Sequence, residues 1–438
     1  MEETSNRLPE KFIERMKAQL PETEWKDFFD EYLKKPWKGV RVNTLKCDTE
    51  RFLKISPFSL SKVEWEETGF RVDEEKVGGS PYHFAGVFYS QEPSAMVAVP
   101  LLEIQEGEKV LDLCSAPGGK GTQIASKLNG TGLVVLNEPV FARAKILSQN
   151  VERMGIKNAV VLSEMPETLA TEFTGYFDKI LVDAPCSGEG MFRKNAEEAL
   201  KEWSEENVLK CAERQAKILE SATKMLKVGG KLVYSTCTFS IEEDEGQARD
   251  FLSKNPQMRL LKREKLYPHK VKGEGHFACL FEKTEQDFSF PSRRKNVKLF
   301  VSKASEKAYR DFEKSFFKEK FAQVLHEAGG ILYALPNGVF DWKGLNVLRV
   351  GVRLGETVNG RFEPSHSLVM ASKGTEIRRV LDLSVDDSCV EKFLRGETVD
   401  GDLENGWCAV CVDGFPIGLG KAVNGVVKNH LPKGIRLK

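Results

Sequence analysis

Apolar residues recur with two different spacings along the middle of the chain. Short apolar runs, among them KVLDLC at 109–114 and FDKILVD at 177–183, are followed by stretches in which apolar residues recur at helical spacing. The other short runs are GLVVL, AVVL, GKLVYS and HFACLFE. Strands that alternate with helices are typical of a mainly parallel sheet with helices on both faces. The pattern therefore predicts an α/β fold with a doubly wound sheet.

The flanking regions have weaker patterns. Residues 8–20 predict an amphipathic helix, and GVRVNTLK at 39–46 alternates as a strand does. GGSPYHFAG at 78–86 indicates a loop or a boundary, after which Ser94 is expected to cap a helix with an apolar inner face. A long helix is predicted around 213–226, and Ser240 with Glu243 fits a capping box at the start of a further helix.

These patterns divide the chain into four predicted segments. Residues 1–80 form a small helical or α+β preface, 81–285 the central α/β domain, and 286–296 a polar linker. The remainder, 297–438, combines a helix at 306–321 with short strands punctuated by glycine. We expect one or two small α/β modules there.

Composition indicates a globular protein and excludes a membrane-spanning one. Of the 438 residues, 41% are hydrophobic and 30% charged, and no apolar run reaches the roughly 18 residues of a membrane span. The first residues lack the basic and apolar regions of a signal peptide. We therefore expect a cytoplasmic protein.

Charge is balanced overall, with 65 basic and 65 acidic residues, but it is uneven along the chain. The stretches 259–272, 293–298 and 421–438 are basic. Each of them is either a solvated face or part of a surface that follows a phosphate backbone.

The nine cysteines are scattered, which favours reduced thiols over a disulfide framework. Cys408 and Cys411 form the one CxxC pair, but they lie in an expected strand, WCAVCVDG, where this spacing points side chains to opposite faces. No His or Cys spacing suggests zinc, so we expect no metal.

Two motifs at strand ends carry candidate chemistry for binding a nucleoside. LDLCSAPGGK at 111–120 places a tight glycine turn between a strand and a helix, where backbone N–H groups can approach a ligand. Glu138 ends the next strand, and an acid at that place can bind two ribose hydroxyls. The pair predicts a nucleoside-type cofactor.

Two cysteines follow neighbouring strands at the same edge. Asp183 and Cys186 lie in DAPCSG after one strand, and Cys237 in YSTCTFSIEEDE ends the next strand along the chain. Ligands bind at the carboxyl ends of strands in open α/β sheets. A single cysteine there is usually a packing residue, but two beside a nucleoside cleft are hard to explain by packing.

In this order, these motifs resemble the RNA cytosine-5 methyltransferases of the NOL1/NOP2/Sun family. HKVKGEGHF, the upstream RVN and YSQEPSAM also fit, and later segments resemble the bacterial RsmF-like branch, so that the similarity covers nearly the whole chain. It implies a Rossmann-like class I methyltransferase, S-adenosyl-L-methionine as cofactor, a PUA-like RNA-binding C-terminal region, and 16S rRNA of the small ribosomal subunit as partner. We expect a monomer.

The resemblance also implies residue roles. Cys237 would attack C6 of cytosine, Cys186 would help to release the product as a base or proton relay, and Asp183 would bind the cytosine ring. The cofactor would be held by the motif residues, by Glu138 with Arg143 nearby, by Glu164 and also by Asp183. The motif residues are Cys114, Ser115, Ala116, Pro117, Gly118, Gly119 and Lys120.

The chain departs from the family pattern at two places. Gly121 follows Lys120 where the family often has threonine, which should loosen the first turn of the helix by up to about 1 kcal/mol relative to alanine. Glu164 stands near a position where the family usually has an aspartate that approaches the adenine.

The target base must be single-stranded or flipped, because a paired base is out of reach of Cys237. His269, Lys270 and Lys272 lie in a basic loop that would approach RNA phosphate, whereas His276 is interpreted first as a structural histidine. Two alternatives stay open. A DNA cytosine-5 methyltransferase would use Cys186 as nucleophile and leave Cys237 unexplained, and a ribosome-assembly protein would only bind RNA.

Overall fold

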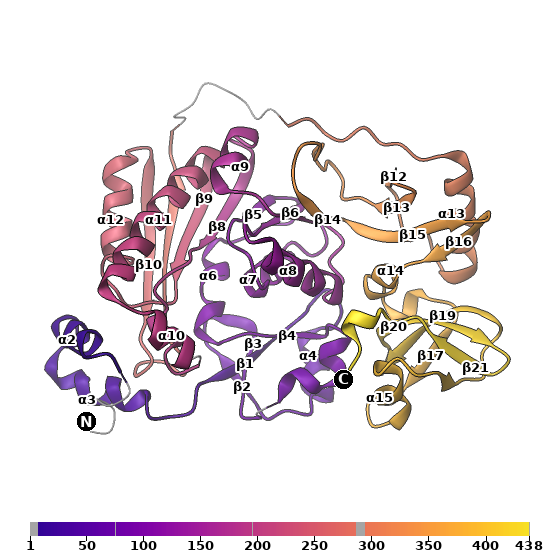
Figure 1. Ribbon diagram of the computed structural model, residues 1–438, viewed down its shortest axis with the longest axis horizontal. Coiled ribbons are helices and arrows are strands. Elements are labelled where there is room, and N and C mark those ends of the chain that lie inside the picture. Colours follow the sequence, from indigo (N-terminus) through magenta and orange to yellow (C-terminus); the bar gives the residue numbers. More distant parts are fainter. Residues whose placement is uncertain (1–7, 75, 195, 286–293, 438) are drawn as a thin grey trace.

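The computed structural model describes residues 8–74, 76–194, 196–285 and 294–437. Within these ranges, the central sheet has eight strands in the order β10-β11-β9-β8-β5-β6-β7-β14 (Figure 1). The five strands from β9 to β7 are parallel, whereas β10, β11 and β14 pair antiparallel with their neighbours. The strands are β5 (Lys109–Asp112), β6 (Leu133–Asn137), β7 (Ala159–Leu162), β8 (Phe177–Asp183), β9 (Leu226–Thr236), β10 (Met258–Leu266), β11 (His276–Lys283) and β14 (Val347–Val350).

Helices cover both faces of this sheet, because alternate side chains of each strand point to opposite sides. Leu111 belongs to the core under α9, α11 and α12, and its neighbour Val110 to the core under α6, α7 and α8. The predicted doubly wound fold is confirmed. The helices are α6 (Ala98–Leu101), α7 (Gly119–Lys127), α8 (Phe141–Arg153), α9 (Pro166–Glu172), α10 (Ala196–Glu202), α11 (Glu205–Met225) and α12 (Glu245–Lys254).

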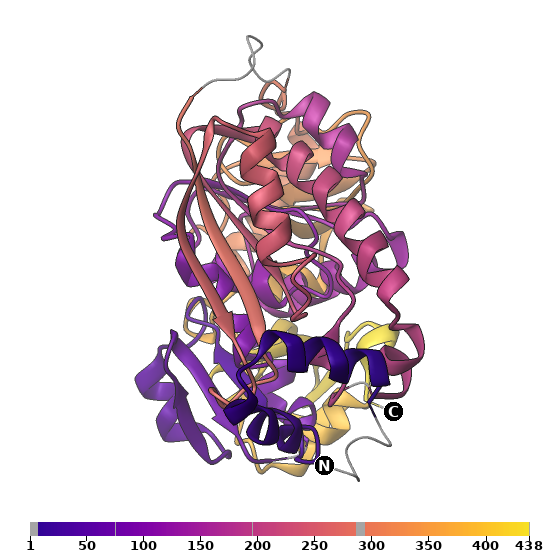
Figure 2. The same cartoon turned by 90° about the vertical axis from the view of Figure 1, so that its left-hand side faces the viewer.

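The N-terminal segment combines helices with a four-stranded antiparallel sheet, β2-β3-β1-β4. Its first two helices lie below the long strands β10 and β11 (Figure 2), where Phe12 and Phe28 pack against Phe192, Trp203 and Phe239. The elements are α2 (Glu10–Gln19), α3 (Glu22–Glu31), β1 (Lys38–Val42), α4 (Thr49–Ile55), β2 (Leu60–Val63), β3 (Glu66–Val72), η1 (Val77–Gly79), α5 (Pro81–Phe84), β4 (Phe88–Ser90) and η2 (Ser94–Met96).

The C-terminal segment forms two further sheets and also completes the central one. Strand β14 pairs with β7 at the edge of the central sheet. The last sheet packs against the N-terminal sheet, with Val42 and Phe415 in one core. The elements are α13 (Lys303–Phe316), β12 (Leu325–Ala328), β13 (Ile331–Ala334), β15 (Val352–Val358), β16 (Arg361–Pro364), α14 (His366–Met370), β17 (Val380–Leu383), α15 (Ser388–Leu394), β18 (Val399–Asp400), β19 (Gly406–Val412), β20 (Phe415–Val423) and β21 (Val426–Asn429).

Several local predictions need correction where tertiary contacts decide the structure. Strand β1 ends at Val42 rather than at residue 46, because the side-chain amide of Asn43 donates to two backbone carbonyls and the chain turns. The predicted loop at 78–86 contains α5, which Pro81 can begin because proline suits the first helical position. Ser94 does not cap a helix; its hydroxyl accepts from the N–H of Gly275 at 3.1 Å, and Glu92 accepts from the N–H of Ser94.

Other predicted elements differ in their limits. The helix predicted at 306–321 is α13, which ends at Phe316 because Phe317 forms a β-bridge with Ile377. The helix predicted around 213–226 begins earlier, at Glu205, where Ser204 caps it. Most of the predicted linker, 286–293, lies outside the described residues. Cys408 and Cys411 do lie on a strand and belong to separate cores, as their spacing predicted.

Candidate active site

The two cysteines at the strand ends lie side by side. Strands β8 and β9 run parallel with Asp183 opposite Ser235, so the loops that follow them begin next to each other. The Sγ atoms of Cys186 and Cys237 are 3.2 Å apart, and the backbone N–H of Cys237 points to the Cys186 sulfur at 3.4 Å. The fold thus brings together the two thiols that are 51 residues apart in the sequence.

The surroundings of Cys186 favour its protonated form. The hydrogen bond with Cys237, burial and the charge of Cys237, in that order, raise the pKa of Cys186 well above its ordinary value, and Glu243 adds to the effect. A thiol that keeps its proton can donate it to the neighbouring sulfur. Either sulfur can be the donor of the 3.2 Å contact, and the raised pKa of Cys186 favours a proton on that sulfur.

Asp183 lies beside the thiols as a charged group. Burial alone would raise its pKa, but Lys120 and His276 lower it more, so that the pKa lies below its ordinary value. The ammonium group of Lys120 donates to Asp183 Oδ2 at 2.8 Å, and the hydroxyl of Ser235 donates to Oδ1 at 2.8 Å. Lys120 therefore links the glycine-turn motif to the end of β8.

The glycine turn between β5 and α7 depends on close packing. Gly118 has a φ of 115°, a backbone conformation that favours glycine, and it precedes the first turn of α7 with its free N–H groups. At Gly121 a Cβ would lie 2.5 Å from Ser115 Oγ and 2.7 Å from Leu136 Cδ2. The departure from the family pattern at Gly121 therefore has a packing reason, because only glycine fits against the strand end.

Glu138 and Arg143 lie together at the end of β6. Glu138 is buried, its carboxylate accepts from the N–H of Val140 at 3.0 Å, and Arg143 Nη1 is 3.3 Å from Glu138 Oε2. Arg143 also donates to the carbonyl of Ala116 at 3.0 Å. Arg143 therefore connects Glu138 to the glycine turn.

Glu164 has a different place from the one expected. Its side chain accepts from the backbone N–H of Asn346 at 2.7 Å, on the segment that leads into β14, and it is not among the residues that line the cavity beside Glu138. Met165, its neighbour, does line that cavity and is 56% exposed. No sequence pattern pointed to Met165, since a methionine after a strand usually packs.

Two cavities meet at Cys237, and Cys186 lines the larger of them. The larger, of about 700 Å³, is lined by Glu138, Arg143 and Met165, and the smaller, of about 260 Å³, by Lys120 and His276. Cys114, Ala116, Asp183, Ala184, Met191 and Cys237 line both. Asp183 and Cys237, the acid and the nucleophile expected from the sequence, therefore lie between the two cavities, where a ligand in one cavity would contact a ligand in the other.

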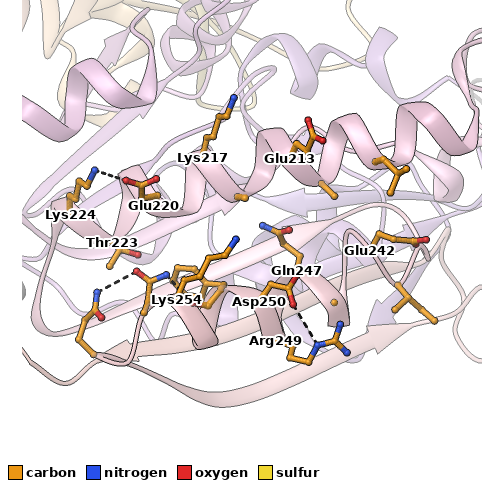
Figure 3. Close-up of a pocket in the computed structure, with 18 residues that line it drawn as sticks. Glu213, Lys217, Glu220, Thr223, Lys224, Glu242, Gln247, Arg249, Asp250 and Lys254 are labelled. Atoms are coloured by element: carbon orange, nitrogen blue, oxygen red, sulfur yellow. Dashed lines mark hydrogen bonds and ion pairs between the residues drawn. The ribbon is translucent and has the colours of Figure 1, made fainter.

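A third hollow, of about 1010 Å³, lies between α11 and α12 (Figure 3). Charged side chains of both signs line it, among them Glu213 and Arg249. Neither cysteine of the pair borders it. From the motif that contains Cys237, Ile241 and Glu242 line this hollow, and both lie beyond the cysteine. The hollow is therefore not a candidate for the reaction site, despite its size.

The capping box predicted from Ser240 and Glu243 does not form. Ser240 donates to Glu189 at 2.8 Å, Glu243 accepts from the backbone N–H of Ser187, and α12 begins later, at Glu245. The side chains that would have capped the helix are used to hold the loop after β8. The flanking threonines also bond across loops, Thr236 to Asp244 and Thr238 to Ser187.

Two buried residues of the smaller cavity were missed or underestimated. Asp112, inside the apolar run LDLC, has no hydrogen-bond partner for either carboxylate oxygen among the described residues, and burial raises its pKa to about 7. His276, interpreted as structural, is buried with both ring nitrogens equally unpartnered there, 3.7 Å from Asp183. The sequence signal that could have identified both residues is a polar side chain within or next to an apolar run, since Asp112 lies in LDLC and His276 begins HFACLFE.

The loop expected to approach RNA phosphate is partly neutralised. His269 Nε2 is 3.0 Å and Lys270 Nζ 2.8 Å from the carboxylate of Glu24 on α3. Across the described part of the chain no group of three or more His, Cys, Asp or Glu residues is arranged to hold a metal ion. No helix in that part is long and apolar enough to cross a membrane.

Comparison with known proteins places this site in a family. Residues 99–305 match the family described as 16S rRNA methyltransferase RsmB/F. The Vibrio vulnificus protein named ribosomal RNA small subunit methyltransferase F is 34% identical over 459 residues, with 97% of each chain covered. The chain belongs to the RsmB/F methyltransferase family. The predicted family and S-adenosylmethionine as its cofactor are thereby confirmed.

Further matches cover the rest of the chain. Residues 8–93 match the RsmF N-terminal domain, 311–371 the first RsmF C-terminal domain, and 380–437 the RsmF PUA domain. The Klebsiella pneumoniae methyltransferase F is 30% identical and covers 99% of this chain and 97% of its own. A solved methyltransferase homologue from Pyrococcus horikoshii is similar in fold, with a TM-score of 0.55 and 26% identity over 60% of this chain and 92% of its own.

Proposed function

We propose that this protein forms 5-methylcytosine in 16S rRNA, with S-adenosylmethionine as methyl donor. The observation that supports this best is the pair of thiols, 3.2 Å apart, beside Asp183 at the junction of two cavities. One cavity can hold the cofactor and the other the base. Relatives named for methylation of small-subunit rRNA match nearly the full length of the chain.

The larger cavity suits the cofactor. Glu138 would accept from the two ribose hydroxyls, and Met165 and Val140 offer apolar walls for the adenine. Cys114 and Ala116 of the glycine turn also line this cavity, and the first turn of α7, next to it, would bind polar groups through its N–H groups. Asp112, a buried carboxylate without a partner among the described residues, would meet the ammonium group of the cofactor at the adjoining cavity. When bound, S-adenosylmethionine supplies an electrophilic methyl group.

Cys237 supplies the nucleophile that the reaction needs, because C5 of cytosine reacts poorly unless C6 carries a substituent. The Cys237 thiolate would form a bond to C6, and the π electron pair of the C5–C6 bond would move to C5. C5 would then take the methyl group, while the electron pair of the broken S–CH3 bond stays on the donor sulfur, which leaves as a neutral thioether. Loss of the C5 proton then returns the electron pair to the ring. The C6–S bond breaks and Cys237 leaves as a thiolate.

Cys186 is poised to accept the C5 proton. Its raised pKa comes first from the hydrogen bond with Cys237, then from burial and then from the charge of Cys237, and the first and third of these are lost once the Cys237 sulfur is bonded to carbon. The pKa of Cys186 then falls, its proton passes to water, and the thiolate takes the proton from C5. Cys186 thus becomes a base only after the covalent intermediate has formed.

Asp183 and Lys120 would stabilise the base in the smaller cavity. The carboxylate of Asp183 remains charged beside Lys120 and can accept from the amino group of cytosine. Lys120 is held within 2.8 Å of Asp183 and places a positive charge where the ring gains electrons during attack. The base must leave any duplex to reach this cavity, and the PUA region would position the RNA.

A mechanism-based trap tests this proposal. RNA with 5-fluorocytidine at the target should form a denaturant-resistant adduct with the wild type, because fluorine cannot leave as a proton does. Cys237→Ala should abolish the adduct, whereas Cys186→Ala should retain it and accumulate it even on ordinary RNA. Cys211→Ala, a buried thiol on α11, is the matched control and should behave as wild type.

The opposite result would overturn the assignment. An adduct that survives Cys237→Ala but vanishes with Cys186→Ala would make Cys186 the nucleophile, as in a DNA cytosine-5 methyltransferase. Absence of any adduct together with RNA binding would leave only a binding role. Bisulfite sequencing of rRNA from cells with and without the protein would identify the modified nucleotides.

A further inference from the structure

A buried glutamate joins the two loops that carry the cysteines. Glu243 lies six residues beyond Cys237, has no exposed side-chain surface, and accepts from the backbone N–H of Ser187 at 3.0 Å. Ser187 follows Cys186 directly. The carboxylate therefore fastens the segment of one thiol to the segment of the other.

The residue on the other side of Cys186 is fastened through the same group. Gln215 on α11 donates to Glu243 Oε2 at 2.8 Å and to the carbonyl of Pro185 at 3.1 Å. The hydroxyl of Tyr234 lies 2.9 Å from Gln215 Oε1 and also contacts the backbone carbonyl of Glu243, and its single proton is shared between these two acceptors. Both neighbours of Cys186 are thus held by one buried network, which limits the movement of its sulfur.

Glu243 also places a buried charge near the thiols. Its Oε1 has no hydrogen-bond partner in the described part of the chain, and its charge raises the pKa of Cys186. Burial first, with a contribution from Glu189, raises the pKa of Glu243 itself to about 7. Among the described residues, the charge of Glu243 also raises the pKa of Cys211 on α11 and of Tyr234 on β9.

We propose that Glu243 is a positioning residue for the two-thiol reaction. Through Ser187 and Gln215 it holds Cys186 against Cys237, and its buried carboxylate belongs to the network that surrounds the contact between the two sulfurs. This inference rests on the proposed function, because it assigns Glu243 a task in forming and releasing the covalent intermediate.

Two substitutions separate the two tasks. Glu243→Ala removes the acceptor for Ser187 and Gln215, so release should slow about tenfold, and the adduct should accumulate on ordinary RNA while KM for RNA stays unchanged. Glu243→Gln keeps an acceptor oxygen but removes the charge. Without that charge the proton is held less firmly on Cys186, and bond formation by Cys237 should slow.

The Gln variant should therefore show an altered pH dependence. Its rate of adduct formation with 5-fluorocytidine RNA should equal the wild-type rate near pH 6, where Glu243 is neutral, and be about tenfold lower near pH 8.5. Glu242→Gln is the matched control, since Glu242 is partly exposed and pairs with Arg15 on α2. It should follow the wild type at both pH values.

The outcomes are distinguishable. If Glu243→Gln follows the wild type at both pH values, or a folded Glu243→Ala releases its product at the wild-type rate, the inference is wrong while the proposed function stands. If Glu243→Ala does not fold, the pH comparison with Glu243→Gln decides. Absence of an adduct with the wild type would overturn the proposed function, and this inference with it.

Discussion

Replacing Gly121 with alanine should destabilise the protein, although alanine is the better helix former. In α7 the exchange gains about 1 kcal/mol of helix propensity. Against this, the new Cβ would lie 2.5 Å from Ser115 Oγ, 2.7 Å from Leu136 Cδ2 and 3.1 Å from Asp112 Oδ2. Overpacking costs roughly 1–3 kcal/mol, and two contacts under 3 Å to buried residues place this site near the upper value. We expect a net loss of about 2 kcal/mol.

Urea unfolding of Gly121→Ala and wild type, followed by circular dichroism, measures this difference. Binding of S-adenosylmethionine by calorimetry should weaken as well, since the new Cβ would press on Asp112, the carboxylate proposed to meet the ammonium group of the cofactor. Gly79→Ala in η1 is the control, because its Cβ would meet no atom within 4 Å, and its stability should stay within about 0.5 kcal/mol of wild type. A Gly121→Ala protein as stable as wild type, with unchanged cofactor binding, would show that helix propensity outweighs packing here.

Three other predictions concern charged groups. Glu138→Gln should weaken binding of S-adenosylmethionine about tenfold in calorimetry, because a neutral amide accepts more weakly from the ribose hydroxyls than a carboxylate does; unchanged affinity would exclude this role. Lys120→Met should leave the carboxylate of Asp183 without its cation, raise the pKa of Asp183 and move the acidic limb of the kcat/KM profile to higher pH, whereas Lys120→Arg should restore most of the activity. Glu243 has a folded pKa of about 7, above its value of 4.5 when unfolded, so the folded state binds protons more tightly and the free energy of unfolding should fall by about 3 kcal/mol as pH rises from 4.5 through 7. Glu243→Gln should remove this part of the slope in urea unfolding at pH 5 and pH 8, and an unaltered slope would contradict the assigned pKa.

The central fold was predictable because its signals are local. Apolar runs such as AVVL and FDKILVD are long enough to indicate buried strands, and the helical stretches between them fix the parallel arrangement. No local pattern predicts the pairing of β14 with β7. More than 180 residues separate Val160 from Val350, and neither strand has a sequence feature that indicates which strand it pairs with.

At the site, the sequence indicated the residues at the strand ends, but it did not indicate which contacts the residues that follow them make. Cys186, Cys237 and Asp183 follow strands directly, so their common edge could be inferred from topology. Ser240 and Glu243 match a local capping pattern, but Glu243 instead accepts from the buried backbone N–H of Ser187. Leaving that N–H without an acceptor would cost more free energy than losing a helix cap whose N–H groups can reach water. Local sequence patterns therefore fail where a side chain must provide a hydrogen-bond partner for the backbone of a loop that is distant in the sequence.

Strand β14, which belongs to the C-terminal segment, pairs antiparallel with β7 of the methyltransferase domain, so the two parts of the chain share one sheet. A truncation after residue 285 would uncover β7, whose four residues are all apolar, as an open sheet edge. Such an edge is a template for aggregation. It would also remove the backbone of Asn346, which bonds both Ser163 and Glu164 next to Met165, a residue that lines the larger cavity. For truncation and for domain exchange within the family, the smallest unit that should resist aggregation therefore extends at least through residue 350.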